Sequence, residues 1–379
     1  MKMHALTLPD TMRLKGLLRE RPLTGPRMVN IHLLNSCDRR CRFCWYFSPL
    51  VSYPSKRQAL DFQVLQRLLH DCAHMGVEEI NLEGGEIALY PRVAEVFGIV
   101  KDLGMRLAAY THLGYGQDHL DYLWRADRLT VNLSAANAGS YRKIHGGDHF
   151  ADVIRNLRIL RKVSQAKGRP CVVLTFIIYK ENFREIPEFI KLARMVAADQ
   201  IIFRLFKATV EMRTLRLSSA ALDELKSILA RAVRMQGGLK TNLEEIKCIL
   251  DNGEWFQDRQ ELEWAGRHND RLFYYNNLAG EKKPCYAGWF FAYIDERGRV
   301  VAPCDNVGVC VAGNINKQSF RDIWFNSAKL RRVRKEALSG VNVERKRWIE
   351  CRYCGHVQFN RNMHERLSQA AVRGHDARV

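Results

Sequence analysis

The stretch CDRRCRFC (residues 37–44) places three thiols, Cys37, Cys41 and Cys44, directly after the apolar run Val29–Leu34. Closely spaced thiolates suit an iron–sulfur cluster or a sulfur-rich zinc site. A closed tetrahedral site needs four ligands. The stretch therefore predicts a metal site whose remaining position is either filled from elsewhere in the chain or left open to another molecule.

The composition indicates a globular protein that keeps its thiols reduced. Of the 379 residues, 47% are hydrophobic, and eleven are cysteines. No apolar run reaches the roughly 20 residues of a membrane helix, and the N-terminus lacks the apolar core of a secretory signal. We therefore expect a cytoplasmic protein without a membrane partner, whose cysteines bind metal rather than form disulfides. The net charge of +19 reflects a solvated surface or an anionic partner.

Short apolar runs alternate with amphipathic stretches along the first half of the chain. The runs predict strands at Val29–Leu34, Glu78–Leu82, Met105–Tyr110, Arg128–Leu133, Cys171–Ile178 and Gln200–Phe206. The stretches between them predict helices, whose apolar faces begin at Phe62, Val93, Val153 and Ile186. A further helix is predicted over residues 217–235. Cys72, Cys171 and Cys248 are interpreted as core residues, and the basic run 331–335 as an exposed helix face.

Strand–helix alternation predicts a parallel sheet with right-handed crossovers. Six units are too few for an eight-fold barrel, so the fold class is α/β, a partial (β/α)6 barrel of the TIM type. Ligands of such sheets bind at the carboxyl ends of the strands, where the triplet lies. The predicted boundaries are a lead-in (1–27), the barrel (28–215), a helix with a linker or lid (216–283), a small α+β domain (284–366) and a tail (367–379).

The three-then-two spacing of the triplet, with aromatic Phe43 before the last thiol, resembles the signature of the radical S-adenosylmethionine (radical SAM) superfamily. The resemblance implies that Cys37, Cys41 and Cys44 hold a [4Fe–4S] cluster whose fourth iron binds S-adenosylmethionine. It also implies reductive cleavage of that cofactor to a 5′-deoxyadenosyl radical. The alternative from the residues alone is a zinc site that borrows a distant ligand.

A second stretch carries the resemblance further. Gly84-Gly85-Glu86 follows the second predicted strand, as in the superfamily, although Ile87 stands where relatives have proline. Paired glycines allow a close backbone approach to a ligand, and a carboxylate can receive the methionine ammonium. We expect Phe43, Gly84, Gly85 and Glu86 to contact the cofactor.

Three further positions end predicted strands. Ser134 follows the fourth strand, where relatives hold polar groups of the cofactor, so it is a cofactor candidate; the alternative is a turn serine. His112 stands where relatives often carry asparagine, and is either an active-site residue or part of a capped turn. Arg204, on the sixth strand, either binds an anionic group in the barrel or pairs with a core acid. His112 and Arg204 are thus the catalytic candidates.

The C-terminal region supplies a second set of thiols. Residues 295–298 predict a hairpin turn between Cys285 and Cys304, and Cys351 and Cys354 follow after a helix. Four thiolates suit zinc or a second [4Fe–4S] cluster. The region resembles the auxiliary-cluster domain of radical SAM enzymes, called SPASM in its full form and twitch in its short form. Five cysteines instead of seven favour the twitch form on Cys285, Cys304, Cys351 and Cys354, with Cys310 spare.

The resemblance implies hydrogen abstraction from an unactivated carbon, an oxidoreductase function through the auxiliary cluster, and an electron donor such as flavodoxin or ferredoxin. The short stretch before the first strand favours a sugar-like or natural-product small molecule, because peptide modifiers often carry a leader-binding domain there. The alternative is a maturase that cross-links, epimerises or oxidises a ribosomally made peptide. A remote alternative is a non-enzymatic zinc protein that binds nucleic acid, but we do not expect a nucleic-acid partner.

Overall fold

The computed structural model describes residues 8–52, 56–253, 255, 257, 284–302, 310–338, 359–360, 362–365 and 367. These residues form an α/β protein whose first half is a partial barrel of strand–helix units. Its contacts divide into two compact units, one of residues 33–59 and 81–272, the other of residues 1–32, 60–80 and 273–379.

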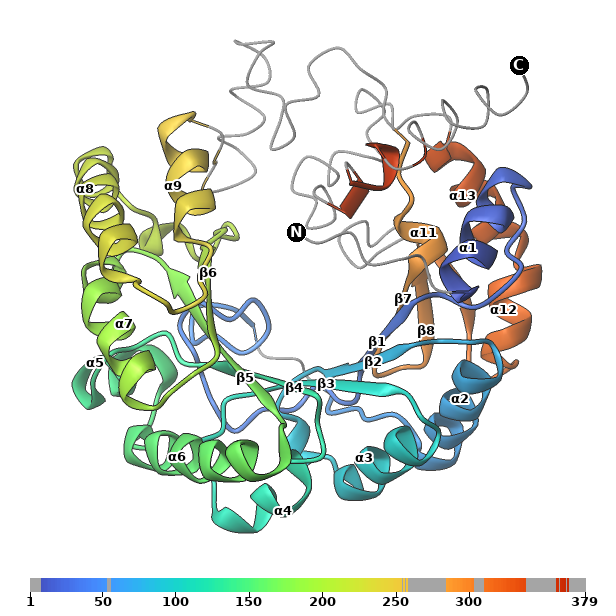
Figure 1. Cartoon of the computed structure of the whole chain (residues 1–379), viewed down its shortest axis with the longest axis horizontal. Coiled ribbons are helices and arrows are strands. Elements are labelled where there is room, and N and C mark those ends of the chain that lie inside the picture. Colours follow the sequence, from blue (N-terminus) through green and yellow to red (C-terminus); the bar gives the residue numbers. More distant parts are fainter. Residues whose placement is uncertain are drawn as a thin grey trace. The chain divides into compact units, whose positions relative to one another are not determined.

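The unit that contains residues 81–272 is built on parallel strands. Strands β3 (Arg106–Thr111), β4 (Arg128–Asn132), β5 (Cys171–Ile178) and β6 (Gln200–Leu205) pair in this order, each parallel to the next. Their centres are apolar and buried, as expected of strands covered on both faces. Helices line the outer side of this sheet (Figure 1), namely α3 (Val93–Asp102), α4 (Leu120–Leu123), α6 (Phe150–Lys167) and α7 (Ile186–Met195). The helices of the unit also include α5 (Ala138–His145), α8 (Ser219–Met235) and α9 (Leu243–Asp251).

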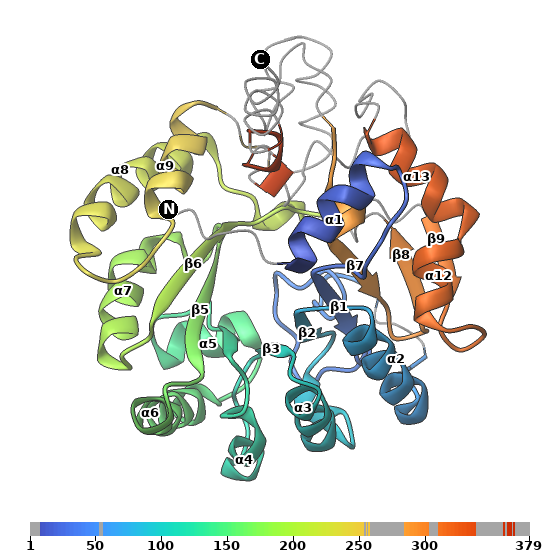
Figure 2. The same ribbon diagram turned by 45° about the vertical axis from the view of Figure 1, so that its right-hand side comes forward.

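The other unit joins the beginning of the chain to its C-terminal part. Strand β1 (Met28–His32) pairs in parallel with β7 (Phe291–Ile294), which continues antiparallel through β8 (Arg299–Ala302) to β9 (Cys310–Asn314). Helices α12 (Phe320–Asn326) and α13 (Ala328–Leu338) lie beside β9 (Figure 2). The remaining helices of the unit are α1 (Leu8–Leu18), α2 (Phe62–His74) and α11 (Ala287–Phe290).

The fold class and all six strands predicted from the sequence are confirmed, with ends that differ by two residues or fewer, and the second strand is β2 (Glu79–Glu83). The side chain of Asp61 caps α2 by accepting from the Val64 N–H at 3.0 Å. The predicted hairpin is present too, because β7 pairs antiparallel with β8 across residues 295–298, where Gly298 adopts a φ of 75°. The predicted domain boundaries remain a prediction.

Two predictions about burial are wrong. Cys72 is buried as expected, but Cys171 and Cys248 are exposed. Cys171 is the first residue of β5, at the end of the sheet. Cys248 lies on the side of α9 opposite to its buried residues, which are Leu243, Ile246, Ile249 and Leu250.

The basic run 331–335 is also not a uniformly exposed face, because Arg334 is 2% exposed. Its Nε and Nη1 groups donate to the carbonyl oxygens of Gly288 and Trp324, each at 2.9 Å. The guanidinium carbon lies 4.1 Å from the ring centre of Trp324 and 5.2 Å from that of Trp289. Burial lowers the pKa of Arg334 to about 9. The side chain thus ties α13 to α11 and α12.

We predict that Arg334→Ala lowers the free energy of unfolding by about 3 kcal/mol or more, because it leaves two buried carbonyl groups unpaired and a cavity between two indole rings. Urea unfolding of the metal-free protein measures this loss. Arg331→Ala, on the exposed side of the same helix, is the matched control and should change the value by less than about 0.5 kcal/mol. Equal losses in the two variants would contradict the prediction.

Candidate active site

The glycine pair after β2 runs directly alongside the residues that precede the cysteine triplet. Main-chain hydrogen bonds join Leu33 N–H to Glu83 O at 2.9 Å, Gly85 N–H to Leu34 O at 2.8 Å and Glu86 N–H to Ser36 O at 2.9 Å. Because these bonds continue up to the residue before Cys37, they hold Glu86 beside the start of the triplet.

Neither glycine leaves room for a side chain. A Cβ atom on Gly85 would lie 1.8 Å from Ser36 O, and one on Gly84 would lie 2.5 Å from Leu34 O. Gly84 also has a φ of 135°, which side chains rarely tolerate. The two backbones can approach this closely only because both positions are glycine.

The triplet loop folds onto the C-terminal end of α5. Arg42 N–H donates to Ile144 O at 2.9 Å and Arg40 N–H to His145 O at 3.4 Å. The last carbonyl groups of a helix have no partner within the helix. The loop and the helix end therefore satisfy each other.

The three thiols are partly buried, and burial raises the pKa of each, that of Cys37 to about 12. Thiolates in such surroundings need a compensating positive charge, which a bound metal supplies by displacing the thiol proton. Main-chain N–H groups also point at two of the sulfur atoms, from Arg39 to Cys37 and from Phe47 to Cys44, each at 3.4 Å. This donor set fits an iron–sulfur cluster held by three thiolates.

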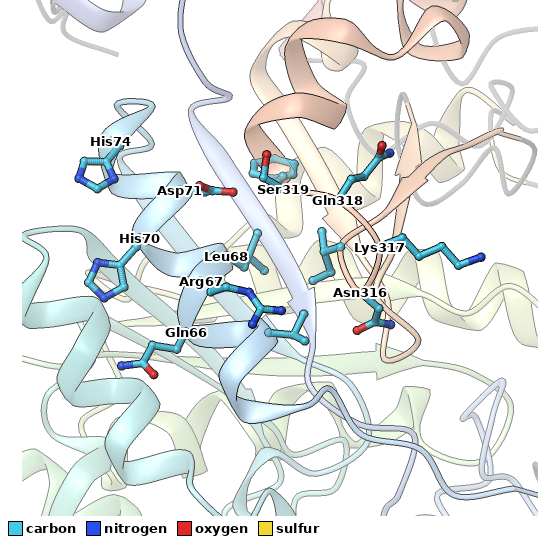
Figure 3. A pocket seen from close by; sticks show the side chains of 13 residues that line it. Gln66, Arg67, Leu68, His70, Asp71, His74, Asn316, Lys317, Gln318 and Ser319 are labelled. Atoms are coloured by element: carbon cyan, nitrogen blue, oxygen red, sulfur yellow. The ribbon is translucent and has the colours of Figure 1, made fainter.

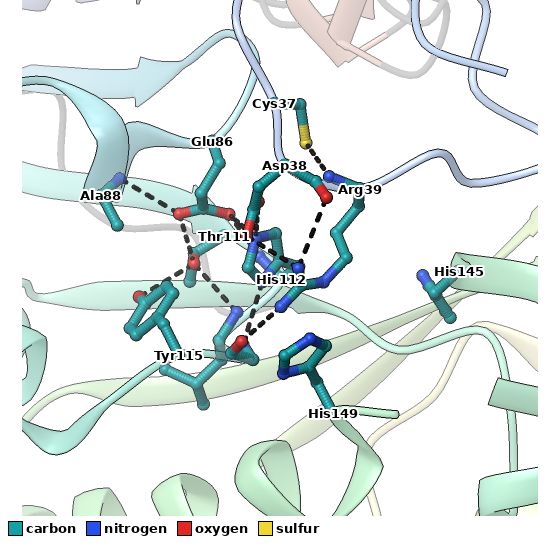
Figure 4. Close-up of polar contacts among 12 residues, drawn as sticks. Cys37, Asp38, Arg39, Glu86, Ala88, Thr111, His112, Tyr115, His145 and His149 are labelled. Carbon is teal, nitrogen blue, oxygen red and sulfur yellow. Dashed lines mark hydrogen bonds and ion pairs between the residues drawn. The ribbon is translucent and has the colours of Figure 1, made fainter. Parts of the chain in front are cut away.

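Glu86 is 2% exposed and is surrounded by hydrogen-bond donors (Figure 4). Its Oε1 accepts from the Thr111 hydroxyl at 2.7 Å and from Ala88 N–H at 3.2 Å. Its Oε2 accepts from His112 N–H at 2.8 Å and lies 3.3 Å from His112 Nε2. The carboxylate is thus fixed at the ends of β2 and β3.

His112 connects Glu86 to the triplet. Gly114 N–H donates to Nδ1 of His112 at 2.9 Å, which leaves the proton of the neutral ring on Nε2. Nε2 lies 2.8 Å from Oδ1 of Asp38, inside the triplet. Burial of the Asp38 carboxyl opposes its ionisation, but the hydrogen bond from His112, the electrostatic interaction with that ring and the charge of Arg39 outweigh this and lower its pKa to about 2. Asp38 is therefore ionised, and it bridges His112 and Arg39.

The other predicted site residues lie in different surroundings. Phe43 is buried and packs edge-on against His145 and Tyr179, with ring centres 5.6 and 6.0 Å apart. Ser134 is fully buried, where its hydroxyl donates to Asn132 at 3.2 Å and accepts from Ile177 N–H at 3.0 Å.

Arg204 is exposed on β6, where its backbone pairs with β5, and its side chain makes no hydrogen bond or ion pair with another described residue. The structure does not place it against a core acid.

Of the four cysteines predicted to form the auxiliary site, Cys285 is the one among the described residues. Cys285 precedes α11, and its N–H donates to Ala337 O at 2.9 Å. Its Sγ accepts from the side-chain amide of Asn360 at 3.5 Å. Cys304, Cys351 and Cys354 lie outside the described residues, as do most of the predicted lid and the predicted tail. The backbone of Cys310 opens β9.

Sequence reasoning missed three residues that the structure brings to the triplet. Asp38 and Arg39 lie inside it, and the Arg39 guanidinium donates to Asp38 and to Gly114 O. His145 lies about a hundred residues away in the chain, with Nδ1 at 3.2 Å from the Sγ of Cys41. The only local feature in the sequence near His145 is the pair of glycines that follows it, which indicates the end of a helix.

A separate hollow is lined by α2 and by residues 315–320 (Figure 3). Arg67 and Asp71 reach toward that segment, whereas His70 and His74 point away from it. Asp71 accepts from the N–H of the next residue along the chain, Arg321, at 3.3 Å. None of its lining residues is a predicted site residue.

Comparison with protein families assigns two regions. Residues 31–193 match the Radical SAM superfamily, and residues 285–355 match SPASM, an iron–sulfur cluster-binding domain. The chain belongs to the radical SAM superfamily. Membership implies a [4Fe–4S] cluster and S-adenosylmethionine as cofactors, and the SPASM match implies one or more auxiliary clusters, as the resemblance predicted.

Among curated relatives, the PqqA peptide cyclase of Methylobacterium sp. (strain 4-46) is 26% identical over 343 residues, 87% of this chain and 82% of the relative. The AdoMet-dependent heme synthase of Methanosarcina barkeri is 25% identical over 322 residues, 83% of this chain and 87% of the relative.

Among solved structures, Streptococcus suis SuiB bound to S-adenosylmethionine aligns with a TM-score of 0.62 at 15% identity, over 86% of this chain and 71% of SuiB. SuiB bound to its precursor peptide SuiA aligns with a TM-score of 0.60 at 16% identity, over 86% and 70%. This likeness shows a shared fold. In the described residues no helix is long and apolar enough to cross a membrane.

We predict that Glu86→Gln weakens S-adenosylmethionine binding about tenfold, because an amide cannot offer the methionine ammonium a charged acceptor. Equilibrium dialysis with the reconstituted, unreduced protein measures the affinity, and iron content should stay at the wild-type value. Glu188→Gln, at an exposed position on α7, controls for the loss of one charge. An unchanged affinity in Glu86→Gln would remove Glu86 from the cofactor site.

Proposed function

We propose that this radical SAM enzyme modifies a peptide by removing hydrogen from an unactivated carbon. The geometry that carries the enzymatic part is the close pairing of Gly84–Glu86 with residues 34–36, directly before the triplet. The peptide part is supported by similarity along 87% of the chain to a relative named PqqA peptide cyclase. From the sequence alone, this substrate class is the alternative to a small molecule.

In this proposal Cys37, Cys41 and Cys44 would hold the cluster. With S-adenosylmethionine and one electron from a donor such as flavodoxin or ferredoxin, the bound group would supply a 5′-deoxyadenosyl radical. Glu86 receives the methionine ammonium. Since Nε2 of His112 also has Asp38 at 2.8 Å, its longer contact with Glu86, 3.3 Å, is the one that an incoming ammonium can replace. Phe43 packs against His145 and Tyr179 beside the triplet, and the Ser134 hydroxyl forms hydrogen bonds at the end of β4.

Exposed apolar side chains beside the triplet support a peptide substrate. Trp45 and Tyr46 directly follow Cys44 and are 52% and 60% exposed. The Trp45 indole N–H donates to Lys207 O at 2.9 Å, close in sequence to Val210, which is 68% exposed. Tryptophan and tyrosine are enriched where proteins bind other chains, and a net charge of +19 favours an acidic peptide.

The auxiliary site completes the proposal. Cys285, Cys304, Cys351 and Cys354 would hold a second cluster, with Cys310 as a spare thiol. An electron taken from the substrate radical by this cluster would make the net reaction an oxidation.

A small molecule is the second candidate substrate. The relative named AdoMet-dependent heme synthase covers nearly as much of this chain at nearly the same identity. Sequence similarity alone therefore does not separate the two substrate classes.

We predict that anaerobic reconstitution loads about eight irons per chain, four for each of two [4Fe–4S] clusters. Replacing Cys37, Cys41 and Cys44 together by alanine should remove about four of them and abolish formation of 5′-deoxyadenosine. Iron and sulfide analysis with chromatography of the nucleoside product measures both. Zinc without iron would overturn the enzymatic proposal, and about four irons in the wild type would remove the auxiliary cluster.

We predict that a peptide encoded beside the gene loses hydrogen atoms, or gains deuterium from solvent after epimerisation, when incubated with the enzyme, S-adenosylmethionine and a reductant. Mass spectrometry of the peptide, with deuterium transfer into 5′-deoxyadenosine from labelled peptide, measures this. The triple-alanine variant is the control. Deuterium transfer from a labelled porphyrin precursor or sugar, and none from the peptides, would select the small-molecule candidate.

A further inference from the structure

Each thiol of the triplet faces an N–H group, but the donor to Cys41 is of a different kind. Cys37 and Cys44 receive main-chain N–H groups from within their own loop. The Sγ of Cys41 lies 3.2 Å from Nδ1 of His145, a side chain contributed by α5.

The hydrogen bonds of His145 fix which nitrogen carries the proton. The main-chain N–H of Ser134 donates to Nε2 at 3.1 Å, so Nε2 holds a lone pair. The proton of the neutral ring therefore sits on Nδ1 and points at the sulfur of Cys41. The imidazole acts as a donor toward Cys41 and as an acceptor toward the end of β4.

Neighbouring groups hold the ring in this orientation. The ring of His145 is fully buried and stacks on Tyr141, with ring centres 4.6 Å apart and planes inclined by 25°. Phe43 closes a second side edge-on. The main-chain carbonyl of His145 receives Arg40 N–H from the triplet loop itself, so backbone and side chain both contact that loop.

We propose that His145 is a positioning residue that donates its Nδ1–H to the Cys41 thiolate and thereby raises the reduction potential of the triplet cluster. A hydrogen bond to a cluster sulfur withdraws negative charge, and it stabilises the reduced cluster, which is more negative, more than the oxidised one. The inference rests on the proposed function in one respect, namely that Cys41 holds the cluster.

Two amide variants distinguish the effect of the hydrogen bond to Cys41 from the effect of the aromatic ring. His145→Asn places an amide near the position of Nδ1, so it can still donate to Cys41 but gives up Ser134. His145→Gln places its amide near the position of Nε2, so it can still accept from Ser134 but gives up Cys41. Both lose the aromatic ring, which makes them matched controls for each other.

The measurement is a redox titration of the reconstituted holoenzyme followed by electron paramagnetic resonance. The triplet signal is the one absent from the triple-alanine variant, which separates it from any auxiliary cluster. At a fixed potential, His145→Gln should show an about tenfold lower ratio of reduced to oxidised triplet cluster, equivalent to about 59 mV for one electron. His145→Asn should remain within about twofold of the wild type.

Two results overturn the inference while leaving the proposed function intact. One is a His145→Gln potential equal to that of the wild type. The other is an equal fall in both variants, which would assign the effect to ring packing. A wild-type protein that loads no iron on the triplet would instead contradict the proposed function itself.

A second measurement does not depend on how the His145 variants fold. In protein labelled with 15N-histidine, the reduced triplet cluster should show a hyperfine coupling to a histidine nitrogen, and this coupling should persist in His112→Asn. Its absence from the wild type, or its loss in His112→Asn, overturns the inference.

Discussion

The site depends on the contact between two backbones at Gly85 and Ser36. A methyl group on Gly85 would lie 1.8 Å from the Ser36 carbonyl oxygen, so any other residue forces the two segments apart. The hydrogen bonds on either side of this contact carry the pairing from Glu83 to Glu86. A displacement here would move Glu86 away from the triplet. It would also disturb the hydrogen bonds that groups at the end of β3 donate to its carboxylate.

The polar and charged side chains around the triplet form a continuous chain of contacts. The Glu86 carboxylate faces the His112 ring, which faces the Asp38 carboxylate, which in turn pairs with the Arg39 guanidinium. Glu86, His112 and Arg39 are almost completely buried, so each needs its partner to remain in place. Metal-free thiols in these surroundings stay protonated because burial raises their pKa values. Metal binding must therefore displace these protons before the thiolates can act as ligands.

Local sequence patterns predicted most of the fold and the first part of the site. Six apolar runs predicted six strands because buried strands have a short, uniform pattern, and the spacing of the triplet is itself a local feature. His145 could not be predicted in this way, since its contact with Cys41 spans about a hundred residues and depends on how α5 packs. Arg334, Cys171 and Cys248 were misjudged for a related reason, because residue type says little about which side of an element meets a neighbour.

The hydrogen bonds of the triplet loop also show which of its parts depend on the rest of the fold. Within the loop, Cys44 N–H reaches Cys41 O at 3.0 Å, so part of its shape is set locally. Two further main-chain bonds, from Arg40 and Arg42, go to the carboxyl end of α5, whose carbonyl groups would otherwise lack partners. Because α5 follows β4, and Ser134 at the end of β4 binds the same imidazole that meets Cys41, the position of the middle thiol is tied to the sheet. The outer thiols, by contrast, receive N–H groups from their own loop, so the middle thiol is the one whose hydrogen-bond donor comes from outside that loop.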